Sequence, residues 1–232
     1  MTPVSLNGLN VYPFTSVDEI LEYVDRNPSL LVAINAEKVV NADDLTREIV
    51  NGGIGYCDGA GAVKAVNRKG AKDAIRIPGC ELWLHIIKRY QKEKTFYVVG
   101  AKKEVNDEVV AKLRTDFPDI RIVGHRDGYI RTDEERQALI DDVAEKRPDV
   151  VFVAMGSPKQ ELLMGDMRRR HEAIYQGLGG SFDVYTGRIQ RAPKWWREHN
   201  LEFAYRFLKQ PSRFRRELKR LKFAWWMLIG KV

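Results

Sequence analysis

Short apolar runs and amphipathic segments alternate along most of the chain. The apolar runs have the length and the β-branched and aromatic content of buried strands, and they cover residues 9–14, 30–35, 54–57, 95–99, 120–123, 150–154 and 173–177. Segments with apolar residues three and four positions apart lie between most of them and predict helices over residues 16–25, 43–50, 61–69, 81–92, 105–116 and 132–146. This alternation predicts βαβ units, and therefore an α/β fold with a Rossmann-like, mostly parallel sheet flanked by helices.

The stretch at residues 149–161, DVVFVAMGSPKQE, stands at the centre of this pattern. Its apolar run ends before Gly156. A helix is then expected to begin with Ser157 as its N-cap and Pro158 in its first position, and Gln160 completes a capping box. A strand, a glycine turn and a helix N-terminus in this order place backbone N–H groups at the carboxyl edge of a sheet, where they bind phosphate and other anions. The alternative is an ordinary βα turn without a ligand.

Two further glycine-rich turns carry an acidic residue. Asp58 lies in the segment IGYCDGAG after one predicted strand, and Asp183 follows the glycines of residues 177–180. An acid at the carboxyl end of a strand suits a general base in the crevice of an α/β sheet. The alternative for Asp58 is an N-cap of the helix predicted from Gly61, and for Asp183 it is a role in its own turn.

Other polar residues follow the predicted strand ends. Asn35 and Glu37 either face the same crevice or cap a helix, and Arg76 either meets a phosphate or is solvated in its loop. Lys159 either contacts a nucleotide or is an exposed side chain of a first helical turn. The catalytic candidates are Asp58 and Arg76, and the candidates for binding substrate or nucleotide are Asn35, Glu37, Gly156, Ser157, Lys159, Gln160, Gly179 and Asp183.

Charge is distributed unevenly over the 232 residues, whose net charge is +7. Residues 191–232 hold 12 Lys and Arg against 3 Asp and Glu, whereas residues 1–190 hold 27 against 29. This division predicts a near-neutral α/β core over residues 1–190 and a basic helical appendage over residues 191–232. A basic segment of this kind is typical of binding to an anionic partner, such as a membrane surface, a lipid phosphate or nucleic acid.

The appendage also carries an apolar stripe. Five apolar residues follow one another at spacings of four, three, four and three, namely Phe214, Leu218, Leu221, Trp225 and Leu228. This spacing predicts that they share one face of a single helix. That face either lies in a membrane interface, with Trp225 and Trp226 at headgroup depth, or packs on the core or on another subunit, as in a homo-oligomer.

Several classes of protein are disfavoured. The two cysteines, Cys57 and Cys80, lack the spacing of metal ligands or of a secreted disulfide scaffold, which indicates a reducing compartment. Neither a signal peptide nor a run of the roughly 18–20 apolar residues of a spanning helix is expected. The P-loop, HExxH, GxSxG and GxGxxG motifs do not occur. The Asp-x-Asp pair does not occur either, which disfavours a metal that holds a nucleotide diphosphate in the manner of many sugar transferases.

Taken in order, these segments resemble the WecG/TagA/CpsF family of glycosyltransferases, and within that family they most resemble the WecG branch. The matching segments run through almost the whole chain and are residues 35–37 (NAE), 58–59 (DG), 76–79 (RIPG), 124–129 (GHRDGY), 155–161 (MGSPKQE), 177–183 (GLGGSFD), 191–193 (RAP), 201–206 (LEFAYR) and 210–213 (QPSR). Each segment is short, but together they form a specific signature.

The resemblance implies an inverting glycosyltransferase that needs no metal. Proteins of the WecG branch move N-acetylmannosaminuronic acid from its UDP donor to polyprenyl-diphosphate-linked N-acetylglucosamine, a step in the synthesis of enterobacterial common antigen. The alternatives are transfer of N-acetylmannosamine from UDP, as for teichoic acid, and a non-enzymatic nucleotide- or RNA-binding module with a phosphate-gripping tail. The enzyme would be cytoplasmic, peripheral on the inner face of the cytoplasmic membrane, and would bind no nucleic acid.

By position, the resemblance also implies roles for individual residues. Asp58 matches the proposed catalytic base, Asn35 and Arg76 match residues of the active-site pocket, and Gln160 matches a residue near the nucleotide. Three arginines of the appendage are expected to meet the diphosphate of the donor or the lipid, namely Arg206, Arg213 and Arg216. Ala33 stands where some members of the family carry Thr, a difference that bears on the choice of donor.

Overall fold

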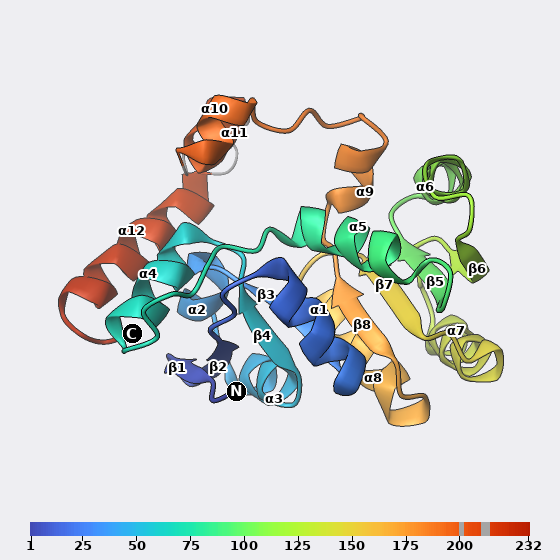
Figure 1. The fold of residues 1–232 in the computed structure, drawn as a ribbon, viewed down its shortest axis with the longest axis horizontal. Coiled ribbons are helices and arrows are strands. Elements are labelled where there is room, and N and C mark those ends of the chain that lie inside the picture. The colour runs from blue at the N-terminus through green and yellow to red at the C-terminus, as the bar shows by residue number, and fades with distance from the viewer. Residues whose placement is uncertain (200–201, 210–213) are drawn as a thin grey trace.

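The computed structural model describes residues 1–199, 202–209 and 214–232, which form one eight-stranded sheet with helices on both faces (Figure 1). The strands are β1 (Val4–Leu6), β2 (Leu9–Tyr12), β3 (Leu30–Ile34), β4 (Ile54–Cys57), β5 (Thr95–Gly100), β6 (Arg121–Arg126), β7 (Val150–Ala154) and β8 (Ile174–Gly177). Their order across the sheet is β1-β2-β4-β3-β8-β7-β5-β6. The β1–β2 pair is antiparallel and the other described pairs are parallel, so the predicted mostly parallel α/β fold is confirmed.

Helices cover both faces of the sheet, and each face has its own hydrophobic core. The helices are α1 (Val17–Arg26), α2 (Ala36–Val40), α3 (Asp44–Asn51), α4 (Ala60–Arg68), α5 (Gly79–Tyr90), α6 (Lys103–Asp116), α7 (Asp133–Lys146), α8 (Lys159–Arg170), α9 (Ser181–Tyr185), α10 (Lys194–Glu198), α11 (Glu202–Lys209) and α12 (Phe214–Leu228). One core lies under α1, α5, α6 and α9, and the other lies under α2, α3, α4, α7 and α8.

Strand β7 shows why its sequence is an uninterrupted apolar run. All five of its residues are buried. Val151 and Val153 belong to one core, whereas Phe152 and Ala154 belong to the other. A parallel strand covered by helices on both faces needs apolar side chains at every position.

Two groups of strands meet at the β3–β8 pair. The strands on one side of this junction, β1, β2, β4 and β3, all come from the chain before Gly59, and those on the other side, β8, β7, β5 and β6, all come after it. Strands β3 and β8 are parallel, with Leu31 opposite Gln176. Ligands of open α/β sheets bind at the carboxyl ends of strands where such groups meet, so the turns that follow these strands form the candidate site.

The predicted strands and helices are all present, and their ends shift by no more than three residues. Ser16 is the N-cap of α1, and its hydroxyl accepts a hydrogen bond from the N–H of Glu19 at 3.0 Å. Within residues 1–190, the elements that the pattern did not predict are short: β1, α2 and α9. Segments of three to five residues are too short to show a hydrophobic period. In the appendage, where only a helical region was predicted, the structure divides the described residues into α10, α11 and α12.

Helix α12 packs on the core with a face other than the predicted stripe. Phe223 and Trp226 are buried, and α12 lies beside α2 and α4 (Figure 1). Phe223 follows Leu221 by two positions, which is about 200° around a helix. Leu221 and Leu228 are 68% and 78% exposed.

Two expectations for the appendage are therefore wrong. The described residues of its stripe are exposed and do not pack on the core, namely Leu218, Leu221, Trp225 and Leu228. Trp226 is not at headgroup depth, because it is buried in the core with Lys222 over its ring at 5.0 Å. None of the described helices is long and apolar enough to cross a membrane. The division of the chain into a core of residues 1–190 and an appendage of residues 191–232 stays a prediction.

The docking of α12 generates the first prediction. Replacing the buried Phe223 with Ala would remove the ring that contacts Gly61 on α4 and would destabilise the protein by about 3 kcal/mol. The free energy of unfolding, measured by chemical denaturation, checks this. The control is Leu221→Ala on the exposed face of the same helix, for which we expect a change within about 0.5 kcal/mol. Equal effects of the two substitutions would contradict the packing.

Candidate functional site

Strands β3 and β4 bring Asn35 and Asp58 to the same edge of the sheet. Ile34 and Cys57 are partners in the β3–β4 ladder, so the residues that follow them are neighbours. The N–H of Asp58 donates to the carbonyl of Ile34 at 3.0 Å. A Cβ placed on Gly59 would lie 3.2 Å from the Cβ of Asn35, so the two turns are in close contact.

Asp58 is held by the loop that carries Arg76 and by the start of α5. Its Oδ1 accepts a hydrogen bond from the N–H of Gly79 at 2.8 Å. Its backbone carbonyl accepts one from Nε of Arg76 at 2.9 Å. The carboxylate is half-buried and its orientation is fixed by a backbone group. Asp58 is not the N-cap of α4, because Gly59 occupies that position and no side chain caps the helix.

Two buried polar residues, Gln176 and Tyr56, support the position of Gly79, and neither was predicted as a site residue. Nε2 of Gln176, a fully buried residue of β8, donates to the carbonyl of Gly79 at 3.2 Å and to the hydroxyl of Tyr56 at 3.3 Å. A Cβ on Gly79 would lie 2.8 Å from that hydroxyl, so glycine is needed here. The only sequence signal was one Gln in the otherwise apolar strand β8.

The neighbours of Asp58 stay protonated. Burial raises the pKa of the Tyr56 hydroxyl well above its ordinary value, and the charge of Asp58 raises it further. Burial and the charge of Asp58 likewise raise the pKa of the Cys57 thiol to about 12. Cys57 is therefore a neutral packing residue near pH 7, whereas Asp58 is the acidic side chain at this strand end.

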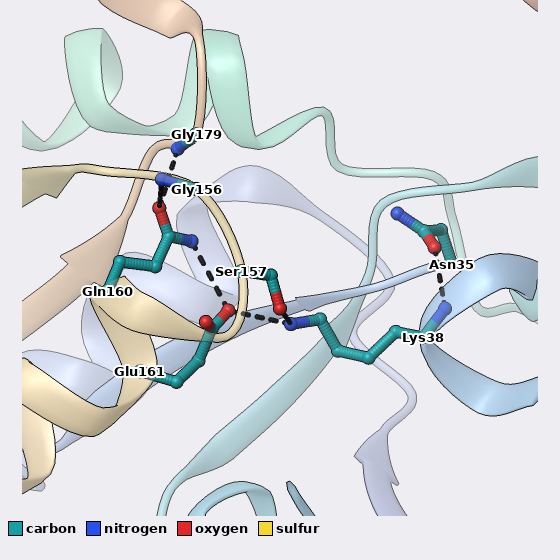
Figure 2. A network of polar contacts seen from close by, with 7 residues as sticks. All are labelled: Asn35, Lys38, Gly156, Ser157, Gln160, Glu161 and Gly179. Carbon is teal, nitrogen blue, oxygen red and sulfur yellow. Dashed lines mark hydrogen bonds and ion pairs between the residues drawn. The ribbon is translucent and has the colours of Figure 1, made fainter. Parts of the chain in front are cut away.

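A second polar cluster joins the turns after β7 and β8 (Figure 2). Oε1 of Gln160 accepts hydrogen bonds from the N–H of Gly156 at 3.1 Å and from the N–H of Gly179 at 2.9 Å. Both glycines have positive φ, at 77° and 56°. These positions favour glycine because other side chains strain this backbone conformation. One carboxamide thus ties together the two glycine turns that the sequence had singled out.

Corrections to the predicted start of α8 follow from this cluster. The helix begins at Lys159, Pro158 is its N-cap, and no side chain caps it. The hydroxyl of Ser157 instead accepts a hydrogen bond from Nζ of Lys38 at 3.0 Å. Gln160 does not complete a capping box, because its side chain bonds the glycine turns.

Lys38 connects this cluster to the turn after β3 (Figure 2). Asn35 caps α2 by accepting a hydrogen bond from the N–H of Lys38 at 3.0 Å. Nζ of Lys38 lies 2.6 Å from Oε1 of Glu161. Gln160 also donates from Nε2 to that carboxylate at 3.2 Å. Lys38 and Glu161 were not among the candidates, because neither belongs to a local pattern that marks an anion site.

Strand β8 joins the two halves of the site. Gln176 donates to the carbonyl of Gly79, the residue whose N–H binds Asp58. The next residue, Gly177, packs against Gln160, since a Cβ there would lie 2.4 Å from Nε2 of Gln160. Successive residues of a strand face opposite sides of a sheet, so this strand supports the Asp58 cluster from one face and the Gln160 cluster from the other.

Several other candidates are placed apart from these clusters or are not described. Glu37 lies 3.7 Å from Nζ of Lys219 and links α2 to α12. Lys159 is exposed, and Asp183 lies half-buried in the first turn of α9. Arg213 lies outside the described residues, and the side chains of Arg206 and Arg216 are outside the described part as well. Within that part, no three His, Cys, Asp or Glu side chains are arranged to hold a metal ion.

Comparison with known protein families matches residues 4–232 to the Glycosyl transferase WecG/TagA/CpsF family. The match includes every strand of the sheet, the turns with Asp58 and Gln160, and α12. The resemblance seen in the short motifs is therefore confirmed, and a transferase is favoured over a non-enzymatic nucleotide- or RNA-binding module. The chain belongs to the WecG/TagA/CpsF family of glycosyl transferases.

Proposed function

We propose that this glycosyltransferase moves N-acetylmannosaminuronic acid from UDP to polyprenyl-diphosphate-linked N-acetylglucosamine, as a step in the synthesis of enterobacterial common antigen. The acceptor specificity and the donor sugar rest on the resemblance of the motifs to the WecG branch. The observation that carries the chemistry is the half-buried carboxylate of Asp58, which the N–H of Gly79 orients at the end of β4. The alternative within the family is transfer of N-acetylmannosamine from UDP.

Asp58 is proposed as the general base of an inverting displacement. The acceptor hydroxyl attacks the anomeric carbon, and Asp58 takes the hydroxyl proton as the new C–O bond forms. The bond from the anomeric carbon to the diphosphate breaks, and UDP leaves with the electron pair. A single displacement inverts the anomeric configuration. Nε of Arg76 donates a hydrogen bond to the backbone carbonyl of Asp58. The guanidinium of Arg76 would offset the negative charge that develops on the leaving diphosphate.

The diphosphate of UDP is proposed to lie against the glycine turns at the start of α8. Helix N-termini favour anions through their unpaired N–H groups and their dipole. The N–H groups of Gly156 and Gly179 already donate to Gln160. We therefore propose that these glycines determine the shape of the turns, and that Ser157 and Lys159 contact the nucleotide. No metal is part of this proposal.

The lipid acceptor implies a membrane surface, and α12 is the element proposed to meet it. Its outward face carries apolar residues that are all at least 48% exposed, namely Leu218, Leu221, Trp225 and Leu228. Three basic residues on or just after the same helix are also exposed, namely Arg220, Lys222 and Lys231. An amphipathic helix with basic flanks lies in the interface of an anionic bilayer. The protein would thus be peripheral on the inner face of the cytoplasmic membrane, with Arg206, Arg213 and Arg216 near the diphosphates. A homo-oligomer through the same face is the alternative.

The donor provides the first test of this proposal. With a short-chain lipid-diphosphate N-acetylglucosamine acceptor, transfer from UDP-N-acetylmannosaminuronic acid should exceed transfer from UDP-N-acetylmannosamine by about tenfold or more. A site that binds the extra carboxylate makes charge-assisted hydrogen bonds that the uncharged sugar lacks. Release of UDP, measured with and without acceptor, gives the rates. Equal or faster transfer of N-acetylmannosamine would favour the teichoic-acid type of reaction.

Asp58 provides the second test. Asp58→Asn keeps the size and the hydrogen bond from Gly79 but removes the base, so turnover should fall by roughly 10²–10⁴-fold. Binding of UDP, measured by calorimetry, should change little. The control is Asp73→Asn, since Asp73 is exposed in the loop after α4. Near-normal turnover of a folded Asp58→Asn protein would show that the base is another group.

Helix α12 provides the third test. The double substitution Leu221→Glu and Leu228→Glu places two charges on the exposed face, and binding to vesicles rich in phosphatidylglycerol should weaken more than about tenfold. Transfer to a water-soluble acceptor should persist, because this face does not pack on the core. Leu45→Glu is the matched control, since Leu45 is 49% exposed on α3. Unchanged vesicle binding by the double variant would refute the role of α12.

A further inference from the structure

A buried ion pair lies beside the glycine turns and has no role in the chemistry described so far. Lys38 of α2 and Glu161 of α8 meet at 2.6 Å, and their side chains are only 10% and 6% exposed. Removing two charges from water costs about as much as their attraction returns, so such a pair contributes little to stability by itself. Oε2 of Glu161 is buried and has no hydrogen-bond partner among the described residues. Two apolar residues would satisfy packing here without that cost.

The pair contacts Gln160, the side chain that joins the two turns. Oε1 of Glu161 accepts from Nε2 of Gln160 at 3.2 Å, on the side of the carboxamide opposite to the glycines (Figure 2). Oε1 of Gln160 then faces two N–H donors, those of Gly156 and Gly179. Lys38 balances the charge of Glu161 and also donates to Ser157 in the same turn as Gly156.

This contact selects the orientation of the carboxamide. An amide has a donor end and an acceptor end of nearly equal size. If the Gln160 amide turned over, its NH₂ would face the two glycine N–H groups, and its oxygen would face a carboxylate. A carboxylate accepts hydrogen bonds and donates none, so Glu161 permits only the orientation in which Oε1 holds both turns.

We infer that Lys38 and Glu161 are positioning residues of the donor site. Through Gln160 they hold the turns after β7 and β8 in the one arrangement that receives the diphosphate of a nucleotide sugar, an inference that rests on the proposed function for its ligand. Lys38 lies on α2, directly after the turn of Asn35, so the same contacts also fix the end of β3 relative to the other two turns. Neither side chain touches the reacting atoms in this arrangement.

Two double variants test the inference. Lys38→Met with Glu161→Leu removes both charges together and leaves Nε2 of Gln160 without an acceptor. Lys38→Met with Glu161→Gln removes the same charges but keeps an amide oxygen at position 161 that accepts from Gln160. Both variants lack the ion pair, so a purely structural role of the pair predicts equal behaviour. A positioning role predicts that only the first variant is impaired.

The first measurement needs no ligand. Hydrogen exchange of the Gly156 and Gly179 amides, followed by NMR, should accelerate about tenfold in the Leu-containing variant and stay near the wild-type rate in the Gln-containing one. If the Leu-containing variant does not fold, Glu161→Met with Lys38 retained takes its place, because Lys38 keeps its bond to Ser157. Unchanged exchange in a folded variant without the acceptor would overturn the inference.

The second measurement is UDP affinity by calorimetry. The dissociation constant should rise about tenfold in the Leu-containing variant and remain within about threefold of wild type in the Gln-containing one. Equal weakening in both would assign the effect to the lost charges and overturn the role of the Gln160 orientation. If the wild-type protein itself binds no UDP, the proposed function fails, whereas the exchange measurement still decides whether Lys38 and Glu161 position the turns.

Discussion

The carboxyl edge of a parallel sheet gathers backbone N–H groups from several turns, and each buried group needs an acceptor. Gln160 meets this requirement for the turns after β7 and β8, because its single oxygen binds the N–H of Gly156 and the N–H of Gly179. The arrangement of the turns at the start of α8 depends on this contact. The contact joins the two turns beyond the point where the β7–β8 ladder ends. The same carboxamide also donates to Glu161, which pairs with Lys38.

The carboxylate of Asp58 is held by a separate but connected set of contacts. The N–H of Gly79 donates to it, and the carbonyl of Gly79 accepts a hydrogen bond from the buried Gln176. Gln176 lies next to Gly177, which packs against Gln160. Strand β8 therefore supports both sets, one on each face, although Asp58 itself follows β4 and the glycine turns follow β7 and β8. Shared support from one central strand suits chemistry that depends on orientation.

Helix α12 packs on the core with one face and exposes apolar residues on another. Phe223 and Trp226 bind it to the core beside α2 and α4, and Lys219 pairs with Glu37 of α2. The opposite face remains apolar and exposed at Leu221 and Leu228. Since α2 begins at the cap formed by Asn35, the proposed membrane contact and the candidate site share one short helix.

Local pattern in the sequence was sufficient for the α/β fold, for the positions of seven of the eight described strands and for the locations of the turns at Asp58 and Gly156. These features depend on hydrophobic period and on residues within four positions of one another. The partner of Gln160 was not predictable in this way: a capping box was expected, but the buried amide bonds a turn 19 residues away. The face of α12 that meets the core was also decided by tertiary structure, because Phe223 and the stripe of Leu221 are both apolar. Period alone identifies an apolar face, whereas only the shape of the surface beside α2 and α4 determines which face is buried there.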